Sequence, residues 1–436
     1  MPRLPQVIAL CCVATLAVAG RVHAQGAPLW ARVSFFTQAA TASVADGPNT
    51  TFAELVTTAT VQAPLTDSSG FGYGVDVRLA GYPMTDGRES RTSVYEAFVA
   101  KRITDRLDVR VGQLWINELG ALGSVGGVLV ESKAGESVAG KLRIGAFGGW
   151  EPRIMNAGWV DEVRKIGTYA ALDAAGSRRH VVGFVHLTNA GTTERSVIST
   201  TNFLSYQQSF YLYQAAEIDL VGPAGQGSGG LTYFLANVRV VPHPLVELQG
   251  TVNRGRSIDS RTIVVEVSQG RPIPARSLEG LRFESVGGRV TIRLWKSARA
   301  YAGYAADRNN RDEDPTGRLT LGVFTANLFG SGIDLTITDH RMRRGDASSY
   351  DSWYVSAGRS LGARMYVSGE FTTSLSVLHA SGTDGFVIES RPRTNRIGAT
   401  GLFHVGRHAS VVATLERTDD DAFTEVRLLA GLTYRF

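Results

Sequence analysis

The sequence has 436 residues, of which 43% are hydrophobic, and its 45 Lys and Arg against 40 Asp and Glu give a formal net charge of +5. So small a balance, without a polybasic run, argues against a dedicated nucleic-acid-binding protein. The only cysteines are Cys11 and Cys12. Disulfides, thiolate metal sites and cysteine nucleophiles are therefore excluded from the rest of the chain.

The first 24 residues have the pattern of a secretory signal peptide. Arg3 precedes an apolar run over residues 7–19, and Val22 and Ala24 occupy the third and last positions before the expected cut. The run is shorter than the ~20 residues of a membrane-spanning helix. A lipoprotein signal at one of the cysteines is the alternative, but Leu10 stands where a small residue is expected. We predict a signal peptide over residues 1–24 and one domain over residues 25–436.

From residue 29 onward, segments of about ten residues alternate apolar and polar side chains. Because successive side chains of a strand point to opposite faces, each segment predicts a β-strand with one apolar face. In chain order the clearest apolar faces run over Leu29 to Phe35, Tyr73 to Leu79, Leu107 to Val111, Leu142 to Ala146, Phe234 to Val240, Leu248 to Val252, Val290 to Leu294, Ile333 to Ile337, Ile397 to Val405, Ala409 to Leu415 and Val426 to Phe436.

Tight and long connections alternate between these segments. The tight ones are Thr104 to Arg106, Gly176 to Arg179, Pro242 to Pro244, Lys296 to Ala298, Phe329 to Gly332, Ser360 to Ala363 and Gly406 to His408. The long polar ones are Pro83 to Arg91, Glu151 to Lys165, Pro223 to Gly229, Arg254 to Arg282, Asp307 to Gly317, His340 to Asp351, Ser376 to Arg393 and Arg417 to Ala422. We therefore predict an all-β fold, a transmembrane up-and-down antiparallel β-barrel of about 18–22 strands, with 22 the best count and no separate plug domain. The lower counts apply if the weak hairpins around Leu114 and Ser205 are not real.

Two soluble all-β folds are less consistent with the sequence. A β-propeller would repeat every ~40–50 residues, and no such repeat is found. Tandem β-sandwiches would need a boundary between domains, and no linker-like stretch separates the segments.

A membrane barrel imposes rules on pairing and on faces. Unpaired backbone groups are costly in hydrocarbon, so the first strand, near Leu29, is expected to pair with the strand ending at Phe436. The apolar face should meet lipid and the face rich in Arg, Asp, Thr and Gly should line the lumen. Aromatic residues near strand ends are expected in interfacial girdles, ordinary strand composition being the alternative. These are Trp115, Trp150, Trp295, Trp353, Tyr434 and Phe436.

The last eight residues, LAGLTYRF, resemble the carboxy-terminal targeting signal of bacterial outer-membrane β-barrel proteins. The resemblance rests on Gly431, the aromatic Tyr434 and the final Phe436, whereas Leu429 stands where that signal usually has a polar residue. It implies insertion into a Gram-negative outer membrane by the barrel-assembly machinery. Over the other residues the likeness is one of pattern, closest to porin-like barrels in general.

On this parity the lumen receives eleven basic and seven acidic side chains. The bases are Arg32, Arg78, Arg110, Lys141, Arg143, Arg239, Arg289, Arg293, Arg396, Arg427 and Arg435, and the acids are Asp76, Asp108, Glu247, Asp334, Glu370, Glu416 and Glu425. The predicted pore-lining set is Arg32, Asp76, Arg78, Asp108, Arg110, Arg143, Arg239, Glu247, Arg289, Arg293, Glu370 and Arg427. The excess of bases predicts a weak preference for anions. The alternative is that most of these groups pair with one another, as the spacing of Asp76 with Arg78 and of Asp108 with Arg110 would allow.

Two loop motifs have weak functional interpretations. Arg344 to Asp346 spell RGD, an adhesion tripeptide that also recurs by chance, and the carboxylates of Asp307 to Asp314 match no Ca²⁺-ligand spacing. No nucleophile elbow, metal-spaced histidine pair or phosphate loop stands out. We expect no enzyme activity, no metal and no cofactor.

Three functional hypotheses follow. The leading one is an outer-membrane channel for small hydrophilic solutes or ions with a weakly anion-favouring lumen. The alternative is a barrel sheath or export conduit for a partner, either a polysaccharide secretion assembly or a periplasmic multihaem cytochrome. An adhesin with a collapsed lumen fits less well, because a barrel of ~18 strands or more encloses more space than side chains fill. Whether the stretch Arg254 to Arg282 folds into the lumen is left open.

Overall fold

The computed structural model describes residues 30–44, 47–65, 70–83, 88–153, 156–174, 176–225, 229–312, 314–345, 348–381 and 387–436. The predicted signal peptide and Leu29 lie outside the described residues, so the structure does not test them.

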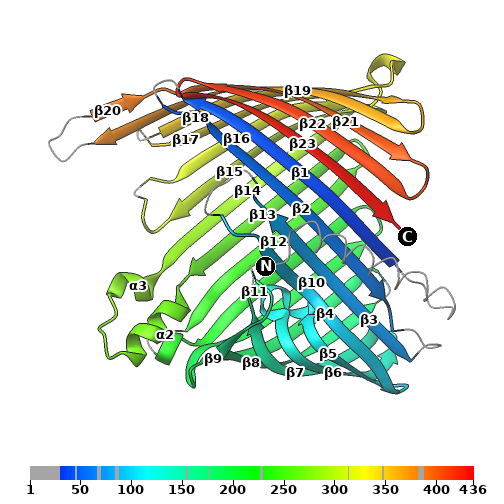
Figure 1. Ribbon diagram of the computed structural model, residues 1–436, viewed down its shortest axis with the longest axis vertical. Coiled ribbons are helices and arrows are strands. Elements are labelled where there is room, and N and C mark those ends of the chain that lie inside the picture. The colour runs from blue at the N-terminus through cyan, green and yellow to red at the C-terminus, as the bar shows by residue number, and fades with distance from the viewer. Residues whose placement is uncertain are drawn as a thin grey trace.

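The described chain forms one antiparallel sheet of 23 strands that closes on itself (Figure 1). Consecutive strands pair with one another, and β1 pairs with β23, whereas β20 pairs with β19 alone and stands outside the ring. The barrel therefore has 22 strands and one extra strand, which confirms the predicted fold and the best count. The strands are β1 (Trp30–Val44), β2 (Thr50–Ala63), β3 (Phe71–Gly81), β4 (Arg91–Thr104), β5 (Leu107–Trp115), β6 (Ser124–Ser137), β7 (Gly140–Pro152), β8 (Trp159–Ala174), β9 (Arg178–Asn189), β10 (Thr192–Tyr206), β11 (Phe210–Val221), β12 (Gly230–His243), β13 (Val246–Ser257), β14 (Leu281–Trp295), β15 (Ala298–Asn309), β16 (Thr316–Thr325), β17 (Ile333–Arg344), β18 (Ser348–Leu361), β19 (Met365–Ser381), β20 (Val387–Ser390), β21 (Arg393–Val405), β22 (Ala409–Asp420) and β23 (Phe423–Arg435).

The seam between β1 and β23 closes the barrel, and Figure 1 shows the two strands side by side in blue and red. Their register runs from Arg32 opposite Arg435 to Val44 opposite Phe423. Beyond the strand itself, the Phe436 backbone N–H donates to the Ala31 carbonyl at 3.0 Å. The predicted pairing of the first and last strands is confirmed.

The outer wall of the barrel is apolar. Large aliphatic and aromatic side chains on the predicted outer parity are exposed, for example Ile144 at 44%, Ile292 at 47% and Leu428 at 50%. A soluble protein would bury such a face. The six aromatics expected near the barrel rims are also exposed.

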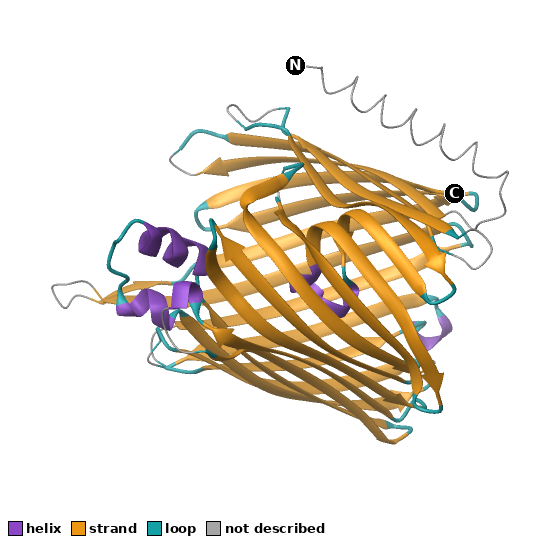
Figure 2. Ribbon diagram, turned by 90° about the horizontal axis from the view of Figure 1, so that it is seen from below, coloured by secondary structure: helices purple, strands orange, loops and turns teal. Residues whose placement is uncertain are grey.

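The two ends of the barrel differ. At the end that also holds the C-terminus, here called the turn end, every connection has two to seven residues, including Gly406 to His408, whereas those at the opposite end range from two residues to the long stretch 258–280. The opposite end, the loop end, carries helices α2 (Ser260–Ser268) and α3 (Ala275–Glu279), which Figure 2 shows as the purple pair beyond the strands.

Four of the predicted long loops are mostly strand: Glu151 to Lys165, His340 to Asp351, Ser376 to Arg393 and Arg417 to Ala422. β17 runs on to Arg344 and β18 begins at Ser348, while β22 and β23 leave only residues 421–422 between them. Polar residues can extend a strand there because charges pair along it, as Arg343 does with Asp351 at 2.8 Å. A transmembrane strand needs only ~9–11 residues, so these hairpins project beyond the apolar belt.

Short helical segments lie at the ends of the barrel or inside it. The stretch Arg254 to Arg282 forms α2 and α3, and the buried Ile263 and Val264 of α2 face η2 (Pro223–Gly225) and β10. Asp259 caps α2 by accepting from the Thr262 N–H at 3.1 Å. Two further 3₁₀ segments are η1 (Asn117–Gly123) and η3 (Leu328–Gly330). No helix in the described ranges is long and apolar enough to span a membrane.

One part of the inner wall departs from the expectation of a polar lumen. From β5 to β10 the inward side chains include Phe147, Val181, Val185 and Val197, which are buried together in one apolar cluster. The reason is η1, which joins β5 to β6 but contacts β8, β9 and β10, and therefore lies inside the barrel against this wall.

A substitution at Gly112 tests how closely the backbones of β4 and β5 approach each other. It has φ +132°, and an added Cβ would lie 2.1 Å from the Ala97 carbonyl oxygen. We expect Gly112→Ala to destabilise the barrel by about 1–3 kcal/mol through backbone strain. Gly250→Ala is the control, because nothing lies within 4 Å of its Cβ position. Heat-modifiable gel migration measures both. An equal unfolding temperature for the two variants would contradict this close approach of β4 to β5.

Candidate functional site

A network of ion pairs holds η1 inside the barrel. Glu118 of η1 accepts through Oε1 from Arg143 and Arg179, each at 2.8 Å. Arg143 also contacts Glu131 and Asp173 of the wall, each at 2.8 Å. Because both Glu118 and Glu131 are largely buried, the guanidinium of Arg143 neutralises carboxylates that would otherwise be costly to desolvate.

Apolar contacts and a buried lysine complete the attachment. Leu119 and Leu122 of η1 belong to the apolar cluster of the wall. Lys165, only 2% exposed, pairs with Glu151 at 2.7 Å and donates to the Ser124 carbonyl at 2.9 Å, just where η1 ends. The lumen is thus filled on the β5 to β10 side, and nothing comparable covers β11 to β23 among the described residues.

Most of the predicted pore-lining charges have an ion-pair partner. The pairs are Arg78 with Glu54 at 3.4 Å, Asp108 with Arg102 at 3.0 Å, Arg239 with Glu247 at 2.8 Å, Glu370 with Arg396 at 3.7 Å and Arg427 with Glu425 at 2.6 Å, besides the Arg143 network. The expected pairings of Asp76 with Arg78 and of Asp108 with Arg110 do not form. Arg78 and Asp108 pair with residues of a neighbouring strand instead, whereas Arg427 does pair with a residue two positions away on its own strand.

Four bases of the predicted pore-lining set have no ion pair in the part of the chain that the structure describes. Arg32 lies over the Trp30 ring at 5.6 Å and Arg289 over the Tyr301 ring at 5.8 Å. The Nε of Arg110 is buried without a hydrogen-bond partner. The guanidinium of Arg293 has no polar partner among the described residues.

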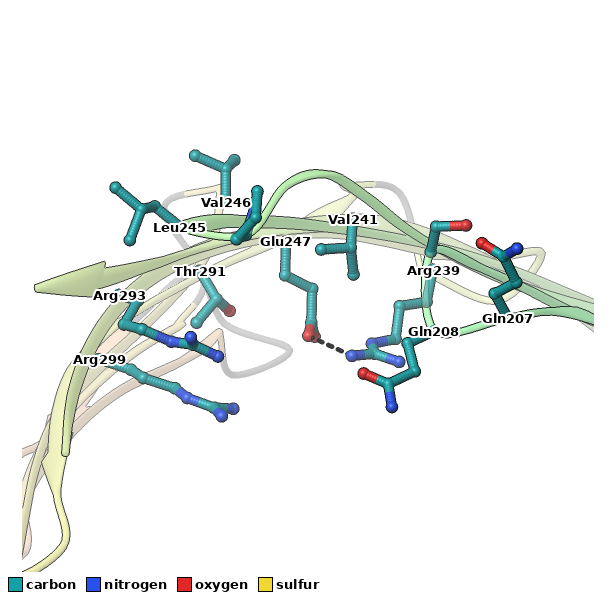
Figure 3. Close-up of a pocket in the computed structure, with 12 residues that line it drawn as sticks. Gln207, Gln208, Arg239, Val241, Leu245, Val246, Glu247, Thr291, Arg293 and Arg299 are labelled. Atoms are coloured by element: carbon teal, nitrogen blue, oxygen red, sulfur yellow. Dashed lines mark ion pairs between the residues drawn. The ribbon is translucent and has the colours of Figure 1, made fainter. Parts of the chain in front are cut away.

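Arg293 belongs to what we call the basic site, formed by Arg239, Glu247, Arg293 and Arg299. It surrounds a cavity of about 740 Å³ at the turn end, bordered by the β10–β11 and β12–β13 turns. Figure 3 shows the four side chains pointing to the same side of the wall, with the ion pair between Arg239 and Glu247 dashed. The lining carries three bases and one acid, a net charge of +2.

Two arginines of the basic site face each other without a neutralising acid. Arg293 of β14 is directly opposite Arg299 of β15, and no carboxylate in the described ranges pairs with either. Like charges directly opposite destabilise a sheet. Glu247 is occupied by Arg239, so the unpaired guanidinium groups are free to bind a carboxylate or phosphate through their planar arrays of N–H donors.

The sequence analysis missed Arg299 of the basic site and, in the ion-pair network around η1, Glu118, Glu131, Asp173 and Arg179. Arg299 follows the tight turn ending at Ala298, and its parity with Tyr301 could have assigned it to the lumen. Glu118 had no comparable signal, because η1 lacks the alternation of a strand and its partners lie 25 and 61 residues away.

The two loop motifs gain no functional support. Asp346 of the RGD lies outside the described residues. In the acidic stretch Asp307 pairs with Arg318 at 2.5 Å and Asp312 pairs with Arg344, while residue 313 is not described. Among described residues, no group of three or more His, Asp or Glu side chains is placed to hold a metal ion.

Comparisons with solved structures return other barrels. Acinetobacter baumannii OccAB4 matches at 8% identity and TM-score 0.43, covering 94% of this chain and 100% of its own. Pseudomonas aeruginosa OpdQ matches at 8% identity and TM-score 0.46, covering 94% and 99%. The P pilus usher PapC translocation pore matches at 10% identity and TM-score 0.47, covering 92% and 99%. No protein-family profile and no curated protein sequence matches the chain significantly.

The chain has the architecture of a porin-like barrel. That statement rests on the closed ring of strands, its apolar outer wall and the two unlike ends. Likenesses at these identities and TM-scores assign neither a family nor a solute.

The ion pairs of η1 in this porin-like barrel can be tested by one neutral substitution. Glu118→Gln removes the charge that Arg143 and Arg179 share, and we expect a loss of roughly 2–3 kcal/mol in local stability with faster hydrogen exchange over residues 117–123. Glu136→Gln is the matched control, since its pair with Lys141 is exposed on both sides and such pairs contribute ~0–1 kcal/mol. Unchanged exchange at η1 in Glu118→Gln would refute its role as an anchor.

Proposed function

We propose that the protein is an outer-membrane channel of porin type for small hydrophilic solutes or ions, with a weak preference for anions. The observation that carries the proposal is the unpaired Arg293 and Arg299 on the inner wall of a closed, outwardly apolar barrel. The outward face is apolar and can contact lipid, and the inward face carries charged side chains that can contact water.

A barrel of this strand number supports passage of solutes. Barrels of 16 strands or more leave a lumen that side chains cannot fill. Here η1 occupies the β5 to β10 side alone. A constricted rather than a wide channel follows, in which solutes move along the β11 to β23 wall past the basic site.

The preference for anions should be weak and dependent on salt. The basic site is exposed, so its charges act through water, where two unit charges 4 Å apart interact by about 1 kcal/mol. At 0.15 M salt the screening length is about 8 Å, comparable to the dimensions of the site. Anion selectivity should therefore be clear at low ionic strength and fade at high ionic strength.

Orientation and assembly follow from the same proposal. The turn end, with the short connections, would face the periplasm, and the loop end with α2 and α3 would face outward. Gly431, Tyr434 and Phe436 would form the signal read by the barrel-assembly machinery. A sheath for a partner chain has less support, because η1 fills part of the space that a partner would need. No enzymatic role is proposed.

Selectivity in planar bilayers tests the channel. We expect discrete conductance steps and an anion-to-cation permeability ratio of about 2–5 in 0.1 M KCl, falling to about 1 in Arg293→Gln/Arg299→Gln. The control is Arg359→Gln at the same end of the barrel, because Arg359 lies on the outer parity of β18, opposite Ile333. Correctly folded protein that passes no current would overturn the channel, and an unchanged ratio in the double variant would overturn the role of the basic site.

The assembly signal makes a separate prediction. The Tyr434 and Phe436 rings contact each other edge to face, with centroids 4.7 Å apart. We expect Phe436→Ala to fold in detergent like the wild type yet reach the outer membrane at less than about half its level, because recognition and not the fold is impaired. Tyr304→Ala, which changes an aromatic 59% exposed on the wall of β15, should assemble normally. Equal surface levels of both variants would contradict the signal.

A further inference from the structure

A second cavity lies at the loop end, away from the basic site. Its volume is about 580 Å³, and β10, β11 and β12 form its wall, η1 one side, and the chain entering α2 another. It shares no lining residue with the basic site. We call it the η1 cavity.

Charges in the η1 cavity cancel. Arg195 donates to Asp219 at 2.7 Å, to Glu217 at 2.9 Å and to the Thr232 hydroxyl at 2.9 Å. Arg256, the other base of the lining, donates to the Glu279 carbonyl at 2.9 Å. Two bases against two acids leave no net charge, in contrast to the +2 of the basic site.

Hydroxyl groups in the η1 cavity lack protein partners. Ser199 is 7% exposed, and its buried Oγ has no hydrogen-bond partner. The hydroxyls of Tyr213, Tyr233 and Thr201 also have none among the described residues. Buried polar groups are normally satisfied, and leaving them open is costly. Only Ser199 of this set is buried, whereas Thr201, Tyr213 and Tyr233 are half-buried and open to solvent, so a bound solute can replace water at these three hydroxyls.

Aromatic surface lies beside these hydroxyls. Tyr213 of β11 and Tyr233 of β12 both line the cavity, Tyr233 directly opposite Glu217 and Tyr213 four residues from Glu217 along β11, and Phe283 of β14 closes the same lining. The ring faces can pack on the C–H faces of a solute while its rim reaches the hydroxyls and Glu217. A volume of this size is within the range of small-molecule sites.

We infer that the η1 cavity binds a neutral polyhydroxylated solute, a mono- or disaccharide. Hydroxyl groups of such a solute both donate and accept, which matches the unpartnered hydroxyls of the wall. An anion would meet two carboxylates and arginines that are already bonded, so it belongs at the basic site. In the proposed channel the η1 cavity would hold the solute at the outer entrance, although binding itself does not require conduction.

Calorimetric titration of the full-length protein in detergent tests the inference, with maltose as the neutral probe and succinate as the charged one. Maltose should bind, and Tyr213→Phe/Tyr233→Phe, which removes only two hydroxyls, should weaken it about tenfold. Tyr211→Phe is the matched control, because Tyr211 lies on the same face of β11, packs on Phe203 at 5.4 Å and does not line the cavity. It should bind maltose as the wild type does.

A second variant blocks the cavity without touching its hydroxyls. Ala121→Trp places a large ring on the η1 side and should abolish maltose binding, with heat-modifiable migration showing that the barrel still forms. Absence of maltose binding in the wild type, wild-type binding in both variants, or competition by succinate for the same cavity would each overturn the inference. Loss of selectivity in Arg293→Gln/Arg299→Gln with maltose binding retained would separate this site from the basic site.

Discussion

Closure of the sheet between β1 and β23 is the constraint on which the structure depends. An open edge of thirteen paired positions would leave a row of backbone N–H and C=O groups exposed to lipid, each costing several kcal/mol. Once the ring closes, the parity of a residue along its strand decides whether its side chain points outward to lipid or inward to the lumen. A side chain that points outward must be apolar, and a charge is tolerated only where it points inward or projects beyond the belt, as Arg343 and Asp351 do.

The two sides of the lumen differ in their side chains and in what covers them. On the β5 to β10 side the inner parity is apolar and η1 covers it, so this half resembles the core of a soluble protein. Glu118 can enter that half only because Arg143 and Arg179 both meet it. On the other side the inner parity stays polar, and most charges pair across strands. The lumen is therefore narrowed from one side by a segment that the barrel itself supplies.

The sequence was sufficient to predict those features that follow from the alternation of apolar and polar residues along a strand. Alternation predicted the strands, their outer faces, the closing pair and the count of 22, because each depends on neighbours in the chain. Interactions between distant segments were beyond it. The stretch around Leu114 looked like a weak hairpin. No pattern in the neighbouring residues indicates that η1 turns into the lumen, where Glu118 pairs with Arg179. Polar residues near Arg343 and Asp419 looked like loops, since their pairing along extended strands is not visible from composition. In the basic site Arg239, Glu247 and Arg293 were predicted and Arg299 was not.

The pairing pattern separates structural charges from those available to solutes. Where an acid forms an ion pair with a base on the neighbouring strand, as Glu247 does with Arg239, the pair stabilises the wall. Arg293 and Arg299 do the reverse, because two like charges face each other and neither has an ion-pair partner among the described residues, an arrangement that destabilises a sheet. In the proposed channel, an anion at the basic site would offset that repulsion, so the site would gain more from an anion than isolated arginines would. The η1 cavity offers the same opportunity without charge, since several of the hydroxyls that line it have no partner among the described residues and a bound solute would replace water there.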